Sequence, residues 1–182
     1  MENQVSLTGT VATRFPLSFK EGFSVQDHFR RTLKAHGYVT MGALLKEDMF
    51  YHIDLWAWID GAQYGIDIKG MKRLSRYGVQ QNKYTCLELH GAHPKNRGWL
   101  YGGKADLIAF EQEESYLLVW RRNLITMAEF VVGREQVRYS SQAVYKIYSR
   151  RDHEQITWIE TTLLRNSWLL FLEVLKTSND YE

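Results

Sequence analysis

Two carboxylates and a lysine stand at matched positions in two neighbouring runs of alternating apolar and polar residues. Asp54 lies in the first run, and Asp67 and Lys69 lie in the second. Between the runs comes Asp60-Gly61, a dipeptide strongly preferred in two-residue type I′ hairpin turns. With these two residues as the turn, Asp54 lies directly opposite Asp67, and Lys69 extends from the same face of the hairpin.

Opposed carboxylates, with Cβ atoms about 4.5 to 5.5 Å apart, repel each other and destabilise a hairpin. A divalent cation between Asp54 and Asp67 would turn this repulsion into ligation, because Mg²⁺ prefers hard oxygen ligands and completes its shell with water and phosphate oxygens. The register therefore predicts a site for Mg²⁺, with Mn²⁺ as a substitute. Two alternatives need no metal: Lys69 could neutralise both acids on a solvated face, or a bulge at Gly65 could change the register.

The same alternation assigns the hairpin residues to two faces. One face is apolar and suits a core; it carries Ile53, Leu55, Ala57, Ile59, Tyr64, Ile66 and Ile68. The other face carries the charged residues together with His52, Trp56 and Trp58. His52, expected opposite Lys69, could contact phosphate or metal-bound water, although a histidine beside a site is more often a hydrogen-bonding neighbour.

The segments around the hairpin predict a mixture of helices and strands. Residues 1–20 are expected to form an irregular lead, whereas apolar spacing over 24–36 and Gly37 predict a helix. Further helices are expected over 123–132 and 166–175, and further strands over 85–91, 105–110, 116–120, 144–148 and 155–161. The predicted fold class is α/β (α+β), with a central mixed β-sheet flanked by helices.

The composition favours one compact domain over residues 1–182. Hydrophobic residues make up 45%, charged residues 24%, and there are only 2 prolines and no linker-like stretch. No segment approaches the ~20 uncharged apolar residues of a membrane helix, and the N-terminus does not resemble a secretory signal, so we expect a cytoplasmic protein with no membrane partner. The single cysteine, Cys86, excludes an intrachain disulfide, and we expect it to pack in the core.

The net charge of +2 does not by itself indicate binding to a polyanion. Basic residues nevertheless cluster after the hairpin, around a Gly-rich segment and in the pair Arg150/Arg151. The candidates for phosphate contacts are Arg73, Arg76, Lys95, Arg97 and Lys104. Such contacts would position a nucleic acid without reading its sequence. The alternative is that these clusters are ordinary solvated faces interspersed with acids.

A helix that carries an acid, followed by a hairpin with Asp on its first strand and Asp-x-Lys on its second, resembles the PD-(D/E)XK nuclease superfamily. The residues are Asp27, Asp54 and Asp67-Ile68-Lys69, and the match covers about residues 24–70. The later stretches GWLYGGKADLIAF and SYLLVWRRNL resemble small phage or prophage nucleases. The resemblance implies a restriction-endonuclease-like core and Mg²⁺-dependent hydrolysis of DNA that leaves a 5′-phosphate.

The resemblance also implies a role for each motif residue. Asp54, Asp67 and the backbone carbonyl of Ile68 would hold the metal against a nonbridging phosphate oxygen. Lys69 would orient the attacking water and stabilise charge in the transition state. Asp27 stands where the family often has Glu, and it could equally be an acid favoured by the helix dipole.

Three further expectations concern residues around the motif. Glu88 could be an additional metal-binding acid. Trp56 and Trp58 could stack on bases, but the family packs its N-terminal helix on that face, so we expect this helix to cover them. His90 and His93 have a spacing seen in zinc sites, but the absence of nearby Cys or His makes zinc a poor expectation.

Other functions fit the same residues. A structure-specific nuclease of the Holliday-junction type would need a homodimer to make paired cuts. An RNA-processing nuclease would cleave RNA and spare DNA. A nucleic-acid-binding or inhibitor protein could keep the nuclease fold without catalysis, although the intact Asp54, Asp67 and Lys69 argue against decay of the site. The sequence leaves open whether cleavage is endonucleolytic or exonucleolytic.

Overall fold

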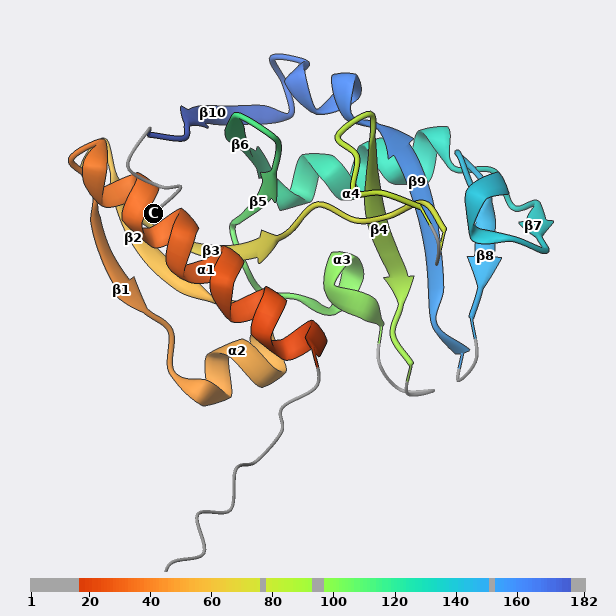
Figure 1. Ribbon diagram of the computed structural model, residues 1–182, viewed down its shortest axis with the longest axis horizontal. Helices are drawn as coiled ribbons and strands as arrows, with labels where there is room; N and C mark the ends of the chain where they lie inside the picture. Colours follow the sequence, from red (N-terminus) through yellow and green to blue (C-terminus); the bar gives the residue numbers. More distant parts are fainter. Residues whose placement is uncertain (1–16, 76–77, 93–96, 151–152, 178–182) are drawn as a thin grey trace, which may run out of the picture.

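The computed structural model describes residues 17–75, 78–92, 97–150 and 153–177. Their strands form a six-stranded and a four-stranded sheet, with helices packed on the larger one (Figure 1). In spatial order the larger sheet contains β1 (Val39–Gly42), β2 (Leu55–Ile59), β3 (Ala62–Lys69), β5 (Leu107–Glu111), β6 (Ser115–Trp120) and β10 (Leu170–Leu175). Because β3 and β5 are parallel and the other pairs antiparallel, the sheet is mixed. The α+β fold class is confirmed.

The β2–β3 hairpin forms around the predicted turn. Asp60 and Gly61 both have positive φ, 51° and 80°, which is what a type I′ turn requires. The strand pairs keep the predicted register, and Gly65 lies within it without a bulge. The ladder ends at the Leu55–Ile66 pair, because the backbone N–H of Asp54 donates to the carbonyl oxygen of this same Ile66. The expected strand pairing of Asp54 with Asp67 is therefore not part of the ladder. Ile53, expected on the face of Leu55, belongs instead to the core cluster that contains Trp56.

The segment before β2 differs from the prediction, because residues 50–54 do not extend the strand. Helix α2 (Leu45–Tyr51) occupies this position, and His52 ends it in the left-handed conformation with φ of 52°. Glu47 stabilises the start of α2 by accepting a hydrogen bond from the backbone N–H of Leu44 at 2.8 Å. The expected strand pairing of His52 with Lys69 is therefore wrong.

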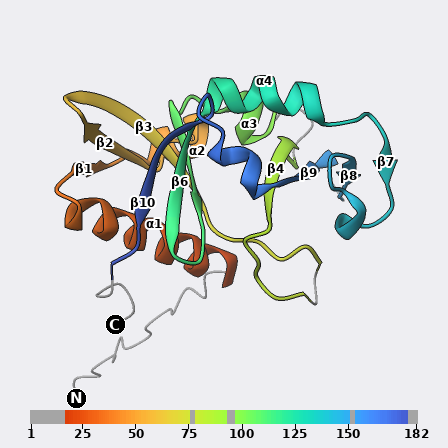
Figure 2. The same cartoon turned by 90° about the horizontal axis from the view of Figure 1, so that it is seen from above.

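Helix α1 (Leu17–Ala35) begins before the predicted residue 24 and covers one face of the larger sheet (Figure 2). Residues 17–20 of the expected irregular lead are therefore helical, and residues 1–16 lie outside the described residues. Phe29 and Leu33 are fully buried in one core cluster with the apolar face of the hairpin. The expectation that this helix covers Trp56 and Trp58 is wrong. The aliphatic side chains under α1 carry no polar atom that needs a partner in the core. The Trp56 indole N–H does need an acceptor, and it donates to Glu47 at 3.3 Å.

The opposite face of the larger sheet is covered by α3 (Gly98–Gly102) and α4 (Arg121–Val131). The sequence did not predict α3, and α4 begins two residues earlier than expected. The core on this side also contains Leu87 and Ile159, which belong to the smaller sheet, together with Ile108 and Phe110 from β5. A shared core therefore joins the two sheets.

The smaller sheet contains, in spatial order, β4 (Tyr84–His90), β9 (Gln155–Glu160), β8 (Ile147–Ser149) and β7 (Gln136–Val137). Strands β4 and β9 match predicted strands, but they form a sheet of their own rather than part of the central one. No helix among the described residues is long and apolar enough to cross a membrane.

The expected helix over 166–175 is wrong, because this segment contains the edge strand β10. It pairs antiparallel with β6 and satisfies the backbone groups along that side of the larger sheet. Val174 is buried against the sheet and Glu173 is exposed. A short apolar run such as this one does not distinguish helix from strand by periodicity alone, so the available partner strand decides.

Candidate active site

The hairpin brings Asp54, Asp67 and Lys69 together, as the sequence predicts. The Asp54 Oδ2 atom accepts a hydrogen bond of 2.6 Å from the backbone N–H of Ile68. The Asp67 Oδ1 atom lies 2.7 Å from the Lys69 Nζ atom. Asp67 is only 1% exposed, so its carboxylate sits in the protein interior beside a second carboxylate and one ammonium group.

The second oxygen of Asp67 is unusual. Oδ2 is buried and has no hydrogen-bond partner among the described residues. A buried carboxylate oxygen without a partner is costly, because it has lost its water without replacing it. A cation bound at this atom would supply the missing interaction, so the donor fits a hard divalent metal ion.

The protein ligands for such an ion are few. In the described part of the chain, no group of three or more His, Cys, Asp and Glu side chains is arranged to hold a metal. A cation at Asp54 and Asp67 would therefore take its remaining ligands from backbone oxygen, water and substrate. This is the usual mode for Mg²⁺, which binds one or two carboxylates and keeps several waters.

The carboxyl groups have perturbed acidity. Burial, followed by repulsion from Asp67, raises the pKa of Asp54 to about 7, although Lys69 and the Ile68 N–H act in the opposite direction. Burial also raises the pKa of Asp67, and the Lys69 ammonium opposes this effect. Near neutral pH, one lysine does not fully compensate the two acids, and the cluster favours additional positive charge.

Lys69 is held in its charged form. Burial would lower its pKa, but the carboxylates of Asp67, Asp54 and Glu88 outweigh burial and raise it. The ammonium also lies 5.0 Å from the centre of the Trp99 ring, in a position for a cation–π interaction. Lys69 is therefore suited to donate hydrogen bonds and stabilise negative charge, and unsuited to act as a free base.

The structure places two further candidates beside the motif. Glu88, on β4, is close enough that Lys69 partly offsets the rise that burial causes in the pKa of Glu88. His52 follows α2, and burial, followed by the charge of Lys69, lowers the pKa of His52, so its imidazole is neutral at pH 7. The roles of both side chains remain predictions.

Asp27 lies at the margin of this cluster. It is exposed on α1 and forms ion pairs with Arg30 at 2.8 Å and Arg31 at 3.4 Å. A hollow of 230 Å³ is lined by both Asp27 and Asp54. The helix therefore faces the acid toward the site region, while its own arginines neutralise it. The catalytic role of Asp27 stays a prediction.

The candidate phosphate contacts divide into three groups. Arg73 is exposed and lines a hollow next to Lys69. Arg97 and Lys104 are exposed near the two ends of α3. Arg76 and Lys95 lie outside the described residues.

Sequence reasoning did not single out Lys72 and Arg150, which line the same hollow as Arg73. Their membership in basic clusters was the available signal. What the sequence could not indicate is that the smaller sheet brings residue 150 next to the hairpin.

Comparisons with known proteins assign no family. No family model matches the chain, and no curated protein matches it by sequence. Among solved structures, it is similar to a bacterial homing endonuclease, I-Ssp6803I, with 15% identity, a TM-score of 0.45, and coverage of 61% of this chain and 74% of that one. At this level of identity and overlap, the similarity assigns no activity to the chain.

Proposed function

We propose that the chain is a metal-dependent deoxyribonuclease that hydrolyses DNA phosphodiester bonds at Asp54, Asp67 and Lys69. The observation that carries this proposal is the buried Oδ2 atom of Asp67, which has no hydrogen-bond partner among the described residues and lies beside a second carboxylate. Membership of the PD-(D/E)XK superfamily is part of the proposal, and the Asp/Asp-x-Lys motif at the base of the β2–β3 hairpin supports it.

Asp54, Asp67 and the carbonyl oxygen of Ile68 would hold the metal. Bound Mg²⁺ or Mn²⁺ would supply a Lewis acid for a nonbridging phosphate oxygen. The N–H of Ile68 donates to Asp54 Oδ2 and restrains this carboxylate, which lies close enough to Asp67 for repulsion between them. Because the pKa of Asp54 is about 7, metal and proton compete for this carboxylate near neutral pH.

Lys69 would act on the attacking water and on the developing charge. Its ammonium is anchored to Asp67 Oδ1 at 2.7 Å, which leaves two of its three donors for water and phosphate. The surrounding acids keep it protonated, so it orients the nucleophile and stabilises the transition state instead of removing a proton.

The test is cleavage of labelled supercoiled, linear, single-stranded and four-way-junction DNA, and of an RNA, with Mg²⁺, with Mn²⁺ and with chelator. We expect metal-dependent cleavage of DNA by the wild type, and its loss in Asp67→Ala and Lys69→Ala. Glu113→Gln, which changes an exposed acid at the β5–β6 tip, is the control and should cleave normally. Equal DNA binding by all proteins without cleavage would instead identify a non-catalytic binding protein. Cleavage of RNA alone would overturn the deoxyribonuclease assignment.

A second candidate, a junction-specific nuclease acting as a homodimer, is favoured by one surface. Edge strand β1 and helix α2 together expose apolar side chains: Val39, Met41, Leu44, Leu45, Met49 and Phe50. A second copy could pair its own β1 there about a two-fold axis and bury both patches. Sedimentation of the wild type and of Phe50→Ser tests this: a dimer that the substitution dissociates supports it, and a monomeric wild type excludes it.

A further inference from the structure

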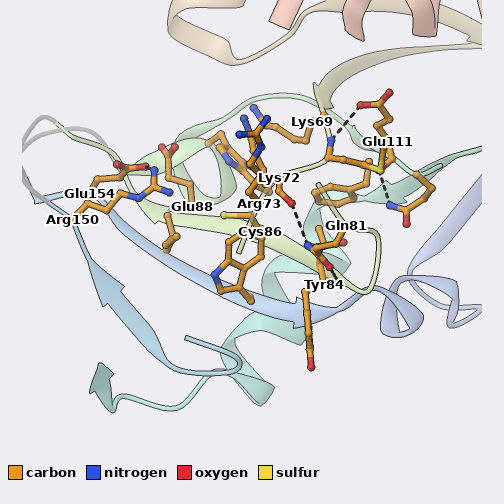
Figure 3. Close-up of a pocket in the computed structure, with 18 residues that line it drawn as sticks. Lys69, Lys72, Arg73, Gln81, Tyr84, Cys86, Glu88, Glu111, Arg150 and Glu154 are labelled. Carbon is orange, nitrogen blue, oxygen red and sulfur yellow. Dashed lines mark hydrogen bonds and ion pairs between the residues drawn. The ribbon is translucent and has the colours of Figure 1, made fainter. Parts of the chain in front are cut away.

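A hollow of 320 Å³ opens beside Lys69, between the segment after β3 and the smaller sheet (Figure 3). Its lining includes the nearly fully buried apolar side chains of Phe110, Ile156 and Trp158, together with polar side chains such as Gln81, Thr85 and Gln112. Its rim carries three exposed cations: Lys72, Arg73 and Arg150. The hollow therefore combines an apolar floor with a cationic edge.

The three cations of the rim line two hollows, one on each side of the chain segment that follows Lys69. Lys72, Arg73 and Arg150 also line an adjoining hollow of 690 Å³, which extends to Val25 and Gln26 on α1. The chain segment that follows Lys69 thus separates two hollows that share the same basic side chains. A polyanionic strand passing over Lys69 would meet these cations on its way.

The acids in the first hollow are compensated. Glu111 is bound to Lys176 at 3.1 Å, and Glu154 is bound to Arg150 at 3.0 Å. Glu88 faces Lys69, whose charge partly offsets the effect of burial on the pKa of Glu88. The remaining charge at the rim is positive, because Lys72 and Arg73 have no acidic partner among the described residues, whereas Arg150 shares its charge with Glu154. This positive charge suits a phosphate group.

We propose that this hollow holds an unpaired nucleotide of the substrate strand, with Arg73 and Arg150 on its phosphate and its base against the apolar floor. The inference rests on the proposed nuclease function and names its substrate class: single-stranded DNA, or DNA unpaired next to the cleaved bond.

The chemistry of the hollow requires an exposed base. In a continuous duplex the faces of the bases are stacked, and only an extruded or unpaired nucleotide presents a face to a protein pocket. The volume of 320 Å³ falls in the range of about 300 to 1,000 Å³ typical of sites for a single small ligand.

The test measures binding without cleavage, in chelator, by fluorescence anisotropy. Probes are a labelled 15-nucleotide single strand and the duplex of the same sequence, with wild type, Arg73→Gln/Arg150→Gln, and Arg138→Gln. Arg138 is a matched control, because it is an exposed arginine next to β7 that stacks on Tyr139 and is not part of the hollow. Circular dichroism and thermal melting confirm that each variant is folded.

We expect the wild type to bind the single strand at least ten-fold more tightly than the duplex. The double variant should lose about ten-fold in single-strand affinity. Its salt dependence should be shallower by about 0.7, since both arginines contact one phosphate and each neutralised phosphate contributes about 0.7 to the slope. A 2-aminopurine base in the single strand should be quenched by the wild type and by Arg138→Gln, and less by the double variant.

Equal affinity for single strand and duplex, or wild-type binding by the double variant, would overturn this inference. Metal-dependent cleavage of duplex would still stand in that case, so the nuclease proposal would survive. Conversely, single-strand preference without cleavage of any substrate would overturn the nuclease proposal and leave the hollow as a binding site.

Discussion

The two sheets of this protein differ in how deeply their ion pairs are buried. The larger sheet holds the most deeply buried ones: Asp67, paired with Lys69, is 1% exposed, and the Lys176–Glu111 pair at its edge has side chains only 6% and 12% exposed. Glu173 on its edge strand is exposed. The ion pairs of the smaller sheet are more open, as in the Arg150–Glu154 pair, whose arginine side chain is 46% exposed. Glu88 on β4, beside Lys69, is half-buried. The two strands farthest from β4 are short, with three residues in β8 and two in β7.

This difference indicates which parts of the protein suit catalysis and which suit the binding of a charged substrate. Ionised groups in the interior are strongly perturbed and costly, so they need the rigid support of long, fully paired strands. Cations that bind a polyanion must instead stay exposed, and they cost little wherever they stand. Changing charges in the larger sheet should therefore have large effects, and changing them in the smaller sheet should have small ones.

The largest effect is expected for Asp67→Asn. The substitution keeps the shape of the side chain but removes a charge that would hold the metal, so the rate of DNA cleavage should fall on the order of 10²- to 10⁴-fold. Single-turnover cleavage in Mg²⁺ measures this, with Glu113→Gln as the unaffected control. A variant that retains wild-type rates would remove Asp67 from the chemistry.

The next effect concerns Asp54 and the pH dependence of stability in chelator. The folded pKa of about 7 lies above the ordinary value of 3.8, so the folded state retains a proton that the unfolded state releases. Stability should therefore fall as pH rises from about 4 to 7, by roughly 2 to 4 kcal/mol, and stay low above that.

Asp54→Asn removes this penalty. Denaturant unfolding should show that the variant is more stable than the wild type at pH 8 and that the difference vanishes near pH 4. Added Mg²⁺ should stabilise the wild type at pH 8 more than the variant, because binding to the folded state raises its stability. Parallel curves for the two proteins across this pH range would contradict the assigned acidity.

A third prediction concerns the buried pair at the edge of the larger sheet. Glu111 accepts hydrogen bonds from Lys176 and from the backbone N–H of Met71, two residues after Lys69. Glu111→Gln leaves the Lys176 charge without its partner, so we expect a loss of about 2 kcal/mol in the free energy of unfolding. The double variant Glu111→Gln/Lys176→Met should recover part of this loss; equal loss in both would show that charge is not the cause.

The smallest effect is expected in the smaller sheet. Lys146 and Glu135 form an ion pair of 2.8 Å with side chains 42% and 61% exposed. Lys146→Ala should change the free energy of unfolding by no more than about 0.5 kcal/mol, because exposed pairs are well solvated before they form. A loss comparable to that of Glu111→Gln would break the contrast between the two sheets.

Features set by neighbouring residues could be predicted from the sequence, and features set by contacts between distant segments could not. The hairpin was predictable, because the positive φ of Asp60 and Gly61 and the alternation around them are local properties. The structure of the residues just before the hairpin was not predictable. Their alternating pattern over 50–54 is typical of a strand, but Glu47 caps a helix that occupies this position.

The sequence by itself determined the register of the β2–β3 hairpin, because a two-residue turn and a period of two leave one register. Only the tertiary structure decided that Asp54 leaves the ladder yet stays close to Asp67 and Lys69, that α1 packs on the face that carries Leu55 and Ile66, and that β10 is a strand. It alone also decided that Glu88 and Arg150 approach Lys69 from a second sheet. These placements depend on contacts between segments far apart in the chain, and such contacts are set by the shared core and the available sheet edges.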